Sequence, residues 1–217
     1  MTVHKPFVIT IVGAESSGKT TLAMRLAWYL GCPWVPEYAR AYLEGLGRPY
    51  TEEDLGIIAS RQLEEINRQL AKSNWQKAKG KKQKVIGKEQ SATVKKESKG
   101  SGPTIDLENV INHIKSSIVN RHSSIVIVDG GMMNMRMWAK IKYGKTIPVV
   151  EEALKNDVTD LYLLCRPLKE WTPDPLREAP SIIDRVWIYN QYLEELIRSE
   201  KRVEIIGGDE NKNLDVN

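Results

Sequence analysis

Short apolar runs along the chain alternate with longer stretches in which apolar residues recur every three or four positions. Near-continuous apolar runs at 7–12, 124–129, 161–165 and 202–206 predict strands buried on both faces of a parallel sheet, and a shorter run at 34–37 predicts another. Helical spacing predicts helices over 18–30, 38–44, 51–70, 105–118, 132–142, 149–156 and 181–199. This alternation indicates an α/β fold, a three-layer sandwich with a parallel sheet of about five strands between helices.

A lysine-rich segment interrupts the pattern after the helix that begins at Thr51. Residues 77–99 hold nine lysines, two glutamates and no arginine or aromatic residue, and Gly100-Ser101-Gly102-Pro103 closes the stretch. Such a composition buries too little apolar surface to offset the entropy of ordering, so we predict a flexible insertion at 77–103. A nucleic-acid-binding arm is the alternative, but missing arginine and aromatic residues disfavour it.

The composition suits one cytoplasmic domain spanning residues 1–217. The chain has 217 residues, 41% of them hydrophobic, and 32 basic against 28 acidic side chains, a net charge too small to imply nucleic-acid binding by the whole protein. Cys32 and Cys165 have no spacing typical of a disulfide framework or zinc site. No apolar run approaches the roughly 18 residues of a membrane span, and the run at 7–12 is too short for a signal peptide. The sequence does not set the number of subunits.

The first predicted strand leads into a phosphate-binding pattern. Gly13-Ala14-Glu15-Ser16-Ser17-Gly18-Lys19-Thr20 fits GxxxxGK[ST] and lies between a strand and an amphipathic helix, as a P-loop requires. Its glycines let the backbone turn N–H groups toward phosphate, and the helix dipole adds to the attraction. The predicted ATP-binding residues are Gly13, Ala14, Glu15, Ser16, Ser17, Gly18, Lys19, Thr20 and Thr21. Lys19 is expected to reach the β- and γ-phosphates, and Thr20 to coordinate Mg²⁺.

Three further segments carry candidate chemistry. Asp129 ends a strand after four aliphatic residues, the Walker B pattern that places a carboxylate near the metal. Glu37 follows the short second strand, where a carboxylate can accept the proton of an attacking hydroxyl. The proline-rich loop 166–180 resembles a lid from which Arg166, Arg177 or Arg185 could reach the triphosphate. The methionines of 132–137, beside Trp138, are expected in the core, with one or two lining a substrate pocket.

These motifs together resemble the NadR-type ribosylnicotinamide kinase domain, a P-loop family also described as AAA-type ATPases. The shared motifs are GAESSGKTTL, PEYAR, the strand ending in Asp129, WxKxxYG at 138–144, DLYLLC at 160–165, WxPDPLR at 171–177 and Asp184-Arg185. The resemblance covers most of 6–75 and 105–208. It implies ATP- and Mg²⁺-dependent phosphorylation of a nucleoside 5′-hydroxyl, nicotinamide riboside being the leading candidate, with a place in NAD metabolism. Lys19, Glu37, Asp129 and Arg177 would be the catalytic residues, and Thr20 and Asp129 the metal ligands.

The chain departs from that family at the strand tip. Relatives usually carry Asp-Thr-Asp or Asp-Thr-Glu, whereas this chain has Asp129-Gly130-Gly131 and lacks the second carboxylate. No nucleotidyltransferase histidine motif precedes the P-loop, so a bifunctional enzyme is not expected. The departure favours the alternative of a P-loop ATPase or nucleotide-dependent switch without kinase activity. A GTPase is disfavoured because the guanine-binding Asn-Lys-x-Asp motif is missing.

Overall fold

A computed structural model of the protein describes residues 5–78, 110–111, 114, 124–171 and 173–207. Its strands are β1 (Phe7–Gly13), β2 (Trp34–Val35), β3 (Ile125–Asp129), β4 (Leu161–Cys165) and β5 (Val203–Ile206). The helices of the described part are α1 (Lys19–Leu30), α2 (Tyr38–Glu44), α3 (Glu52–Ala78), α6 (Gly131–Tyr143), α7 (Pro148–Lys155) and α8 (Ile182–Arg198). The predicted α/β class is confirmed.

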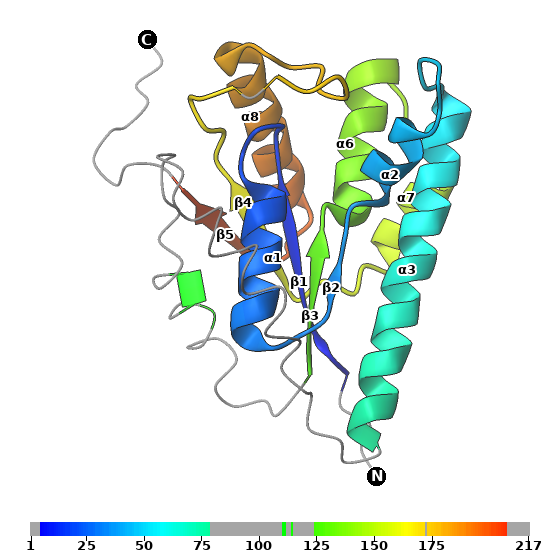
Figure 1. The fold of residues 1–217 in the computed structure, drawn as a ribbon, viewed down its shortest axis with the longest axis vertical. Coiled ribbons are helices and arrows are strands. Elements are labelled where there is room, and N and C mark those ends of the chain that lie inside the picture. Colours follow the sequence, from blue (N-terminus) through cyan, green and yellow to red (C-terminus); the bar gives the residue numbers. More distant parts are fainter. Residues whose placement is uncertain (1–4, 79–109, 112–113, 115–123, 172, 208–217) are drawn as a thin grey trace.

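The strands form one parallel sheet in the order β2-β3-β1-β4-β5 (Figure 1). The first strand of the chain therefore lies at the centre, between two strands that follow more than a hundred residues later. Ile11 pairs with Asp129 of β3, and Gly13 pairs with Cys165 of β4. In open parallel sheets, ligands bind beyond the carboxyl ends of the strands where the strand order reverses, and the P-loop leaves β1 at this point.

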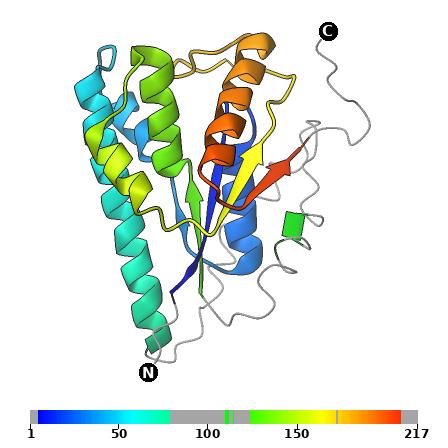
Figure 2. The same ribbon diagram turned by 180° about the vertical axis from the view of Figure 1, so that it is seen from behind.

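Helices cover both faces of the sheet, as Figures 1 and 2 show from opposite sides. On one face, Ile9 and Ile11 of β1 pack with Leu22 and Leu26 of α1. On the other face, α3, α6 and α7 pack against β1, β2 and β3, while α8 packs against β4. Side chains of β1 alternate between these layers, which explains why its sequence is apolar at nearly every position.

The element bounds follow the sequence prediction closely, with one larger difference. Helix α3 continues to Ala78, so the first two residues of the segment predicted as a flexible insertion are helical. The rest of that segment lies outside the described residues, and its flexibility stays a prediction. Of the predicted helix over 105–118, residues 110, 111 and 114 are described, and all three are helical and buried. Among the described helices, none has the length and apolar character needed to cross a membrane.

The start of α3 is fixed by a reciprocal cap. The Asp54 carboxylate accepts hydrogen bonds from the Thr51 backbone N–H at 2.7 Å and from the Tyr42 hydroxyl at 2.7 Å, and the Thr51 hydroxyl accepts from the Asp54 N–H at 3.4 Å. Arg48 adds an ion pair to Asp54 at 2.7 Å. The Arg48 guanidinium and these N–H and O–H donors hold the pKa of Asp54 well below its usual range. The cap joins α2, the 45–50 turn and α3.

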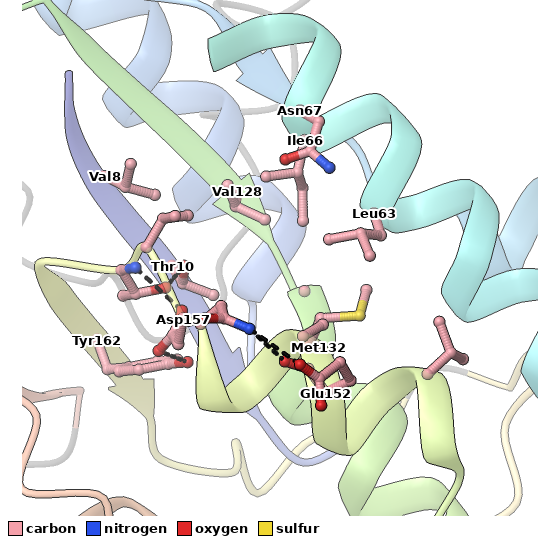
Figure 3. Close-up of a pocket in the computed structure, with 16 residues that line it drawn as sticks. Val8, Thr10, Leu63, Ile66, Asn67, Val128, Met132, Glu152, Asp157 and Tyr162 are labelled. Carbon is pink, nitrogen blue, oxygen red and sulfur yellow. Dashed lines mark hydrogen bonds between the residues drawn. The ribbon is translucent and has the colours of Figure 1, made fainter. Parts of the chain in front are cut away.

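A largely apolar cavity of about 390 Å³ lies between α3, α7 and the sheet. Figure 3 shows Leu63 and Ile66 of α3 facing Val128 of β3 and Met132 of α6 across it. The polar groups at its floor are paired within the protein, among them the Tyr162 hydroxyl, which donates to Asp157 at 2.8 Å. The first turn of α6 separates this cavity from the site described next.

Candidate functional site

The P-loop joins β1 to α1 in a conformation that its residues impose. Gly13 has φ +145°, and a Cβ there would lie 2.6 Å from the Cys165 carbonyl oxygen, so β4 leaves room only for glycine. Ser16 has a positive φ of 51°, rare outside glycine. The Lys19 ammonium donates a hydrogen bond of 2.8 Å to the Ala14 carbonyl oxygen, which keeps it against the loop.

Asp129 lies beside this loop at the tip of β3 and is fully buried. Neither carboxylate oxygen has a hydrogen-bond partner in the described protein. Burial and the neighbouring charge of Glu37 raise the pKa of Asp129 to about 6. The nearby Thr20 hydroxyl and Lys19 ammonium act in the opposite direction, although neither donates a hydrogen bond to the carboxylate. Burying an ionised carboxylate without a partner destabilises the folded protein unless a cation compensates the charge.

These groups fit a magnesium ion that takes some of its ligands from the protein and the others from nucleotide phosphates. Mg²⁺ prefers oxygen ligands and is commonly held by one or two carboxylates together with substrate phosphates, rather than by a cage of protein ligands. The unpaired oxygens of Asp129 supply such a carboxylate beside the Thr20 hydroxyl. The described residues contain no cluster of three or more His, Cys, Asp or Glu side chains able to hold a metal.

Glu37 enters the site from the opposite wall. It precedes α2 as the N-cap residue in an extended conformation, and one residue separates it from β2. Its Oε1 accepts a hydrogen bond of 3.2 Å from the side-chain amide of Asn134, in the first turns of α6. The charge of Glu37 raises the pKa of Asp129, so the two carboxylates are close enough to interact electrostatically. Two carboxylates are thus brought together, one from the tip of β3 and one from the residue that precedes α2.

The loop 166–180 closes over the P-loop through several direct contacts. The Glu15 carboxylate accepts hydrogen bonds from the backbone N–H groups of Glu178 and Ala179, each at 2.9 Å for Oε2. Arg177 donates to the Ser16 hydroxyl at 2.9 Å. At its far side the loop is tied to α2 by an ion pair between Asp174 and Arg40. The loop therefore spans the site as a lid, and Arg177 lies beside the P-loop.

Arg185 does not point toward the phosphate site, although its place after the lid suggests that it could reach the triphosphate. It is almost fully buried, and its guanidinium donates to the carbonyl oxygens of Leu168 at 2.9 Å and Glu170 at 3.3 Å. The guanidinium also lies 5.2 Å from the centre of the Trp171 ring. Because these contacts occupy it, Arg185 supports the lid from below rather than reaching toward phosphate. Arg166 is not among the residues that line the cavity described next.

A cavity of about 220 Å³ is lined by the P-loop, Glu37 and Arg177, while Asp129 and Arg185 are not among its lining residues. One part of its wall is polar and contains the P-loop, Glu37 and Arg177. The other part is largely apolar and includes two aromatic side chains; its residues are Leu43, Tyr50, Leu55, Ile58, Met135 and Trp138. Of the methionines at 132–137, Met135 lines this cavity, while Met133 and Met137 are buried in the core, as expected for most of them.

Asn134 and Tyr192 belong to the site although no sequence motif singles them out. Both are buried, and the Tyr192 hydroxyl donates to Asn134 Oδ1 at 2.9 Å. One feature of the sequence could have pointed to Asn134: it is a carboxamide in the otherwise apolar, methionine-rich start of a helix. A buried polar side chain needs a hydrogen-bond partner. The partners of Asn134 are Glu37, which precedes α2, and Tyr192 of α8, and residue spacing reveals neither.

Comparison with known proteins identifies the family and the fold. A family model described as an AAA domain matches residues 8–86 and 88–212, most of the chain. No curated protein matches the sequence. Solved structures with this fold include a NadR protein in complex with NR, at 19% sequence identity with a TM-score of 0.64, covering 97% of this chain and 48% of that one.

Two further structures are similar. A NadR protein in complex with NAD and AMP-PNP matches at 18% identity with a TM-score of 0.59, covering 94% of this chain and 45% of that one. A thymidylate kinase from Ehrlichia chaffeensis matches at 13% identity with a TM-score of 0.50, covering 98% of this chain and 92% of that one. The chain spans about half the length of the NadR structures. At these identities the likeness establishes the fold and neither the activity nor the substrate.

Proposed function

The chain belongs to this AAA domain family, and we propose that it is a kinase that transfers the γ-phosphoryl group of ATP to a hydroxyl group of a small, nucleoside-like acceptor. Nicotinamide riboside is the leading candidate, and the implied setting is NAD metabolism in the cytoplasm. The observation that carries the proposal is the cavity lined by the P-loop, by Glu37 and by an apolar wall with two aromatic side chains. A protein that only binds or hydrolyses ATP needs no such acceptor wall.

The proposal assigns roles to polar residues that line the cavity and to Asp129 beside the P-loop. Lys19 and the P-loop hold the β- and γ-phosphates, and Arg177 offsets charge that develops on the transferred group. Thr20 and Asp129 would hold Mg²⁺, which would neutralise phosphate charge. Glu37 accepts the proton of the acceptor hydroxyl. Positioning and charge neutralisation supply most of the rate enhancement in phosphoryl transfer, and these residues supply both.

The apolar wall favours an acceptor with a flat, weakly polar part. Tyr50 and Trp138 present aromatic surface, and Leu43, Leu55 and Ile58 add aliphatic surface. A heterocyclic base is a good match because it can stack on aromatic rings while its ribose carries hydroxyl groups. A NadR protein with the same fold was solved in complex with NR, which supports a nucleoside-type acceptor.

A switch or slow ATPase is the second candidate. One feature favours it: the tip of β3 carries a single carboxylate, Asp129, followed by Gly130 and Gly131. If a second carboxylate is needed to bind the acceptor, this chain would bind ATP without transferring its phosphoryl group.

The deciding experiment measures ADP production from Mg²⁺-ATP with and without nicotinamide riboside and a panel of nucleosides. We expect strong stimulation by one nucleoside, lost in Lys19→Ala and retained in Lys72→Ala, which removes an exposed lysine of α3 outside the cavity. Tight ATP binding without stimulation by any nucleoside would overturn the kinase proposal and leave the switch.

A further inference from the structure

We infer that Asn134 is a positioning residue for Glu37: its side-chain amide fixes the carboxylate that accepts the proton of the acceptor hydroxyl. The inference rests on the proposed function, because it assigns a role within the same phosphoryl transfer. Asn134 Nδ2 donates to Glu37 Oε1 at 3.2 Å, which connects α6 to the residue that precedes α2. No hydrogen bond to the other carboxylate oxygen, Oε2, is found within the described residues, so Oε2 can face a substrate.

The amide of Asn134 is itself held from behind. Its side chain is 1% exposed, and its Oδ1 accepts the hydrogen bond from the Tyr192 hydroxyl of α8. A carboxamide that accepts on one side must present its donors on the other, so this contact directs the NH₂ group toward Glu37. Tyr192 is 2% exposed and packs in the core layer between β4 and α8. The support behind Asn134 therefore belongs to the rigid part of the fold.

Packing of α6 also sets the direction of Asn134. Met132 lies in the cluster with α3 and α7, and Met133 in the cluster with α8. With those two faces of the first turn buried against different layers, Asn134 is left on the side that lines the catalytic cavity. The same turn thus separates the apolar cavity of Figure 3, which Met132 lines, from the catalytic one.

Gly130 makes the contact between Asn134 and Glu37 possible. Its φ is +80°, and a Cβ at this position would lie 2.7 Å from Asn134 Nδ2 and 3.2 Å from Glu37 Oε1. Any side chain here would push the amide and the carboxylate apart. The glycine that distinguishes this strand tip from Asp-Thr-Asp or Asp-Thr-Glu therefore has a consequence: it opens the space through which α6 reaches Glu37.

A neutral amide suits this task better than a cation would. A lysine or arginine beside Glu37 would hold the carboxylate firmly but would also stabilise its charge and weaken it as a proton acceptor. A carboxamide donates a hydrogen bond while adding no net charge. It restricts the rotamers of a long side chain, and accurate placement of a proton acceptor matters strongly for rate.

The test compares Asn134→Ala and Tyr192→Phe with the wild type, using the acceptor that stimulates ADP production. We expect Asn134→Ala to lower kcat by about 10- to 100-fold, the range for a misplaced catalytic group, with the KM for ATP changed less than about twofold. In a Glu37→Gln background the same substitution should lower kcat by less than about threefold, because the group it positions is already disabled. Tyr192→Phe, which preserves the core volume, should give a smaller loss in the same parameter.

The matched control is Asn190→Ala, which removes an exposed asparagine of α8 and should leave kcat unchanged. Equal losses from Asn134→Ala in the wild-type and Glu37→Gln backgrounds would overturn the inference, as would an unchanged kcat. If no nucleoside stimulates the wild type, the proposed kinase function fails separately, and the same double-mutant cycle is run on Mg²⁺-ATP hydrolysis. There, additive effects overturn the inference and non-additive effects support it, with water in place of the acceptor hydroxyl.

Discussion

Replacing Asp129 with asparagine should abolish activity and, relative to the wild type, make the ligand-free protein more stable as the pH rises. The carboxylate is buried and without a hydrogen-bond partner, and its pKa is about 6 against 3.8 for an ordinary Asp. The folded protein therefore binds the Asp129 proton more tightly than the unfolded chain does. Ionisation of Asp129 costs nothing below about pH 4, costs progressively more up to about pH 6, and costs its full value above that.

The magnitude follows from the shift of the pKa. A difference of about two pKa units at about 1.4 kcal/mol per unit amounts to about 3 kcal/mol at pH 8, and about half of that applies at pH 5. The asparagine side chain has a cost of its own in a site without partners, but that cost does not vary with pH. The stability of Asp129→Asn relative to the wild type should therefore rise by about 1.5 kcal/mol between pH 5 and pH 8, roughly 3–6 °C in Tm for a chain of this length.

The assay is thermal unfolding of both proteins at pH 5, 6, 7 and 8 in EDTA and without nucleotide. Asp184→Asn, at an exposed position in the first turn of α8, is the matched control and should show a difference from the wild type that stays constant over this range. Addition of Mg²⁺ and ATP should raise the Tm of the wild type more than that of Asp129→Asn. A difference that stays flat or falls from pH 5 to pH 8 would refute the reasoning, because the buried carboxylate would then carry no ionisation cost.

Other substitutions test the loop, the lid and the cap. Gly13→Ala should destabilise the protein by about 1–3 kcal/mol in thermal unfolding and weaken ATP binding, because the new Cβ would meet the Cys165 carbonyl at a position with positive φ. Glu15→Ala should raise the KM for ATP by roughly tenfold and speed proteolysis within the lid, since charge-assisted hydrogen bonds to the backbone at 178 and 179 are lost; an unchanged KM would show that the lid closes without them. Asp54→Asn should reduce stability at pH 7 and make stability fall less steeply in acid. The lowered pKa of Asp54 stabilises the wild type at pH values above the pKa of this group in the unfolded chain, and this contribution is lost as the pH drops. Urea unfolding at pH 7 and pH 3 measures both effects.

The secondary-structure elements and the phosphate-binding loop follow from local sequence. Strands buried on both faces have continuous apolar runs, and amphipathic helices have apolar residues every three to four positions. The position of β4 and the bounds of α2 therefore follow from local sequence. The P-loop is equally local, because its glycines, Lys19 and Thr20 act within one turn between β1 and α1. Helix α3 continues beyond its predicted end, because a lysine-rich composition indicates exposure without excluding a helix.

Which of these groups lie together depends on contacts between segments that are far apart in the sequence. Glu37 and Asn134 lie 97 residues apart, and their hydrogen bond exists because β2 and β3 are neighbours whose carboxyl ends meet at one edge of the sheet. The same holds for Arg177 beside the P-loop and for Arg185 beneath the lid, two arginines that look alike in sequence. Residue spacing indicates only which side chains are close along the chain. Distances between segments depend on the strand order, on the packing of α6 and on the absence of a Cβ at Gly130.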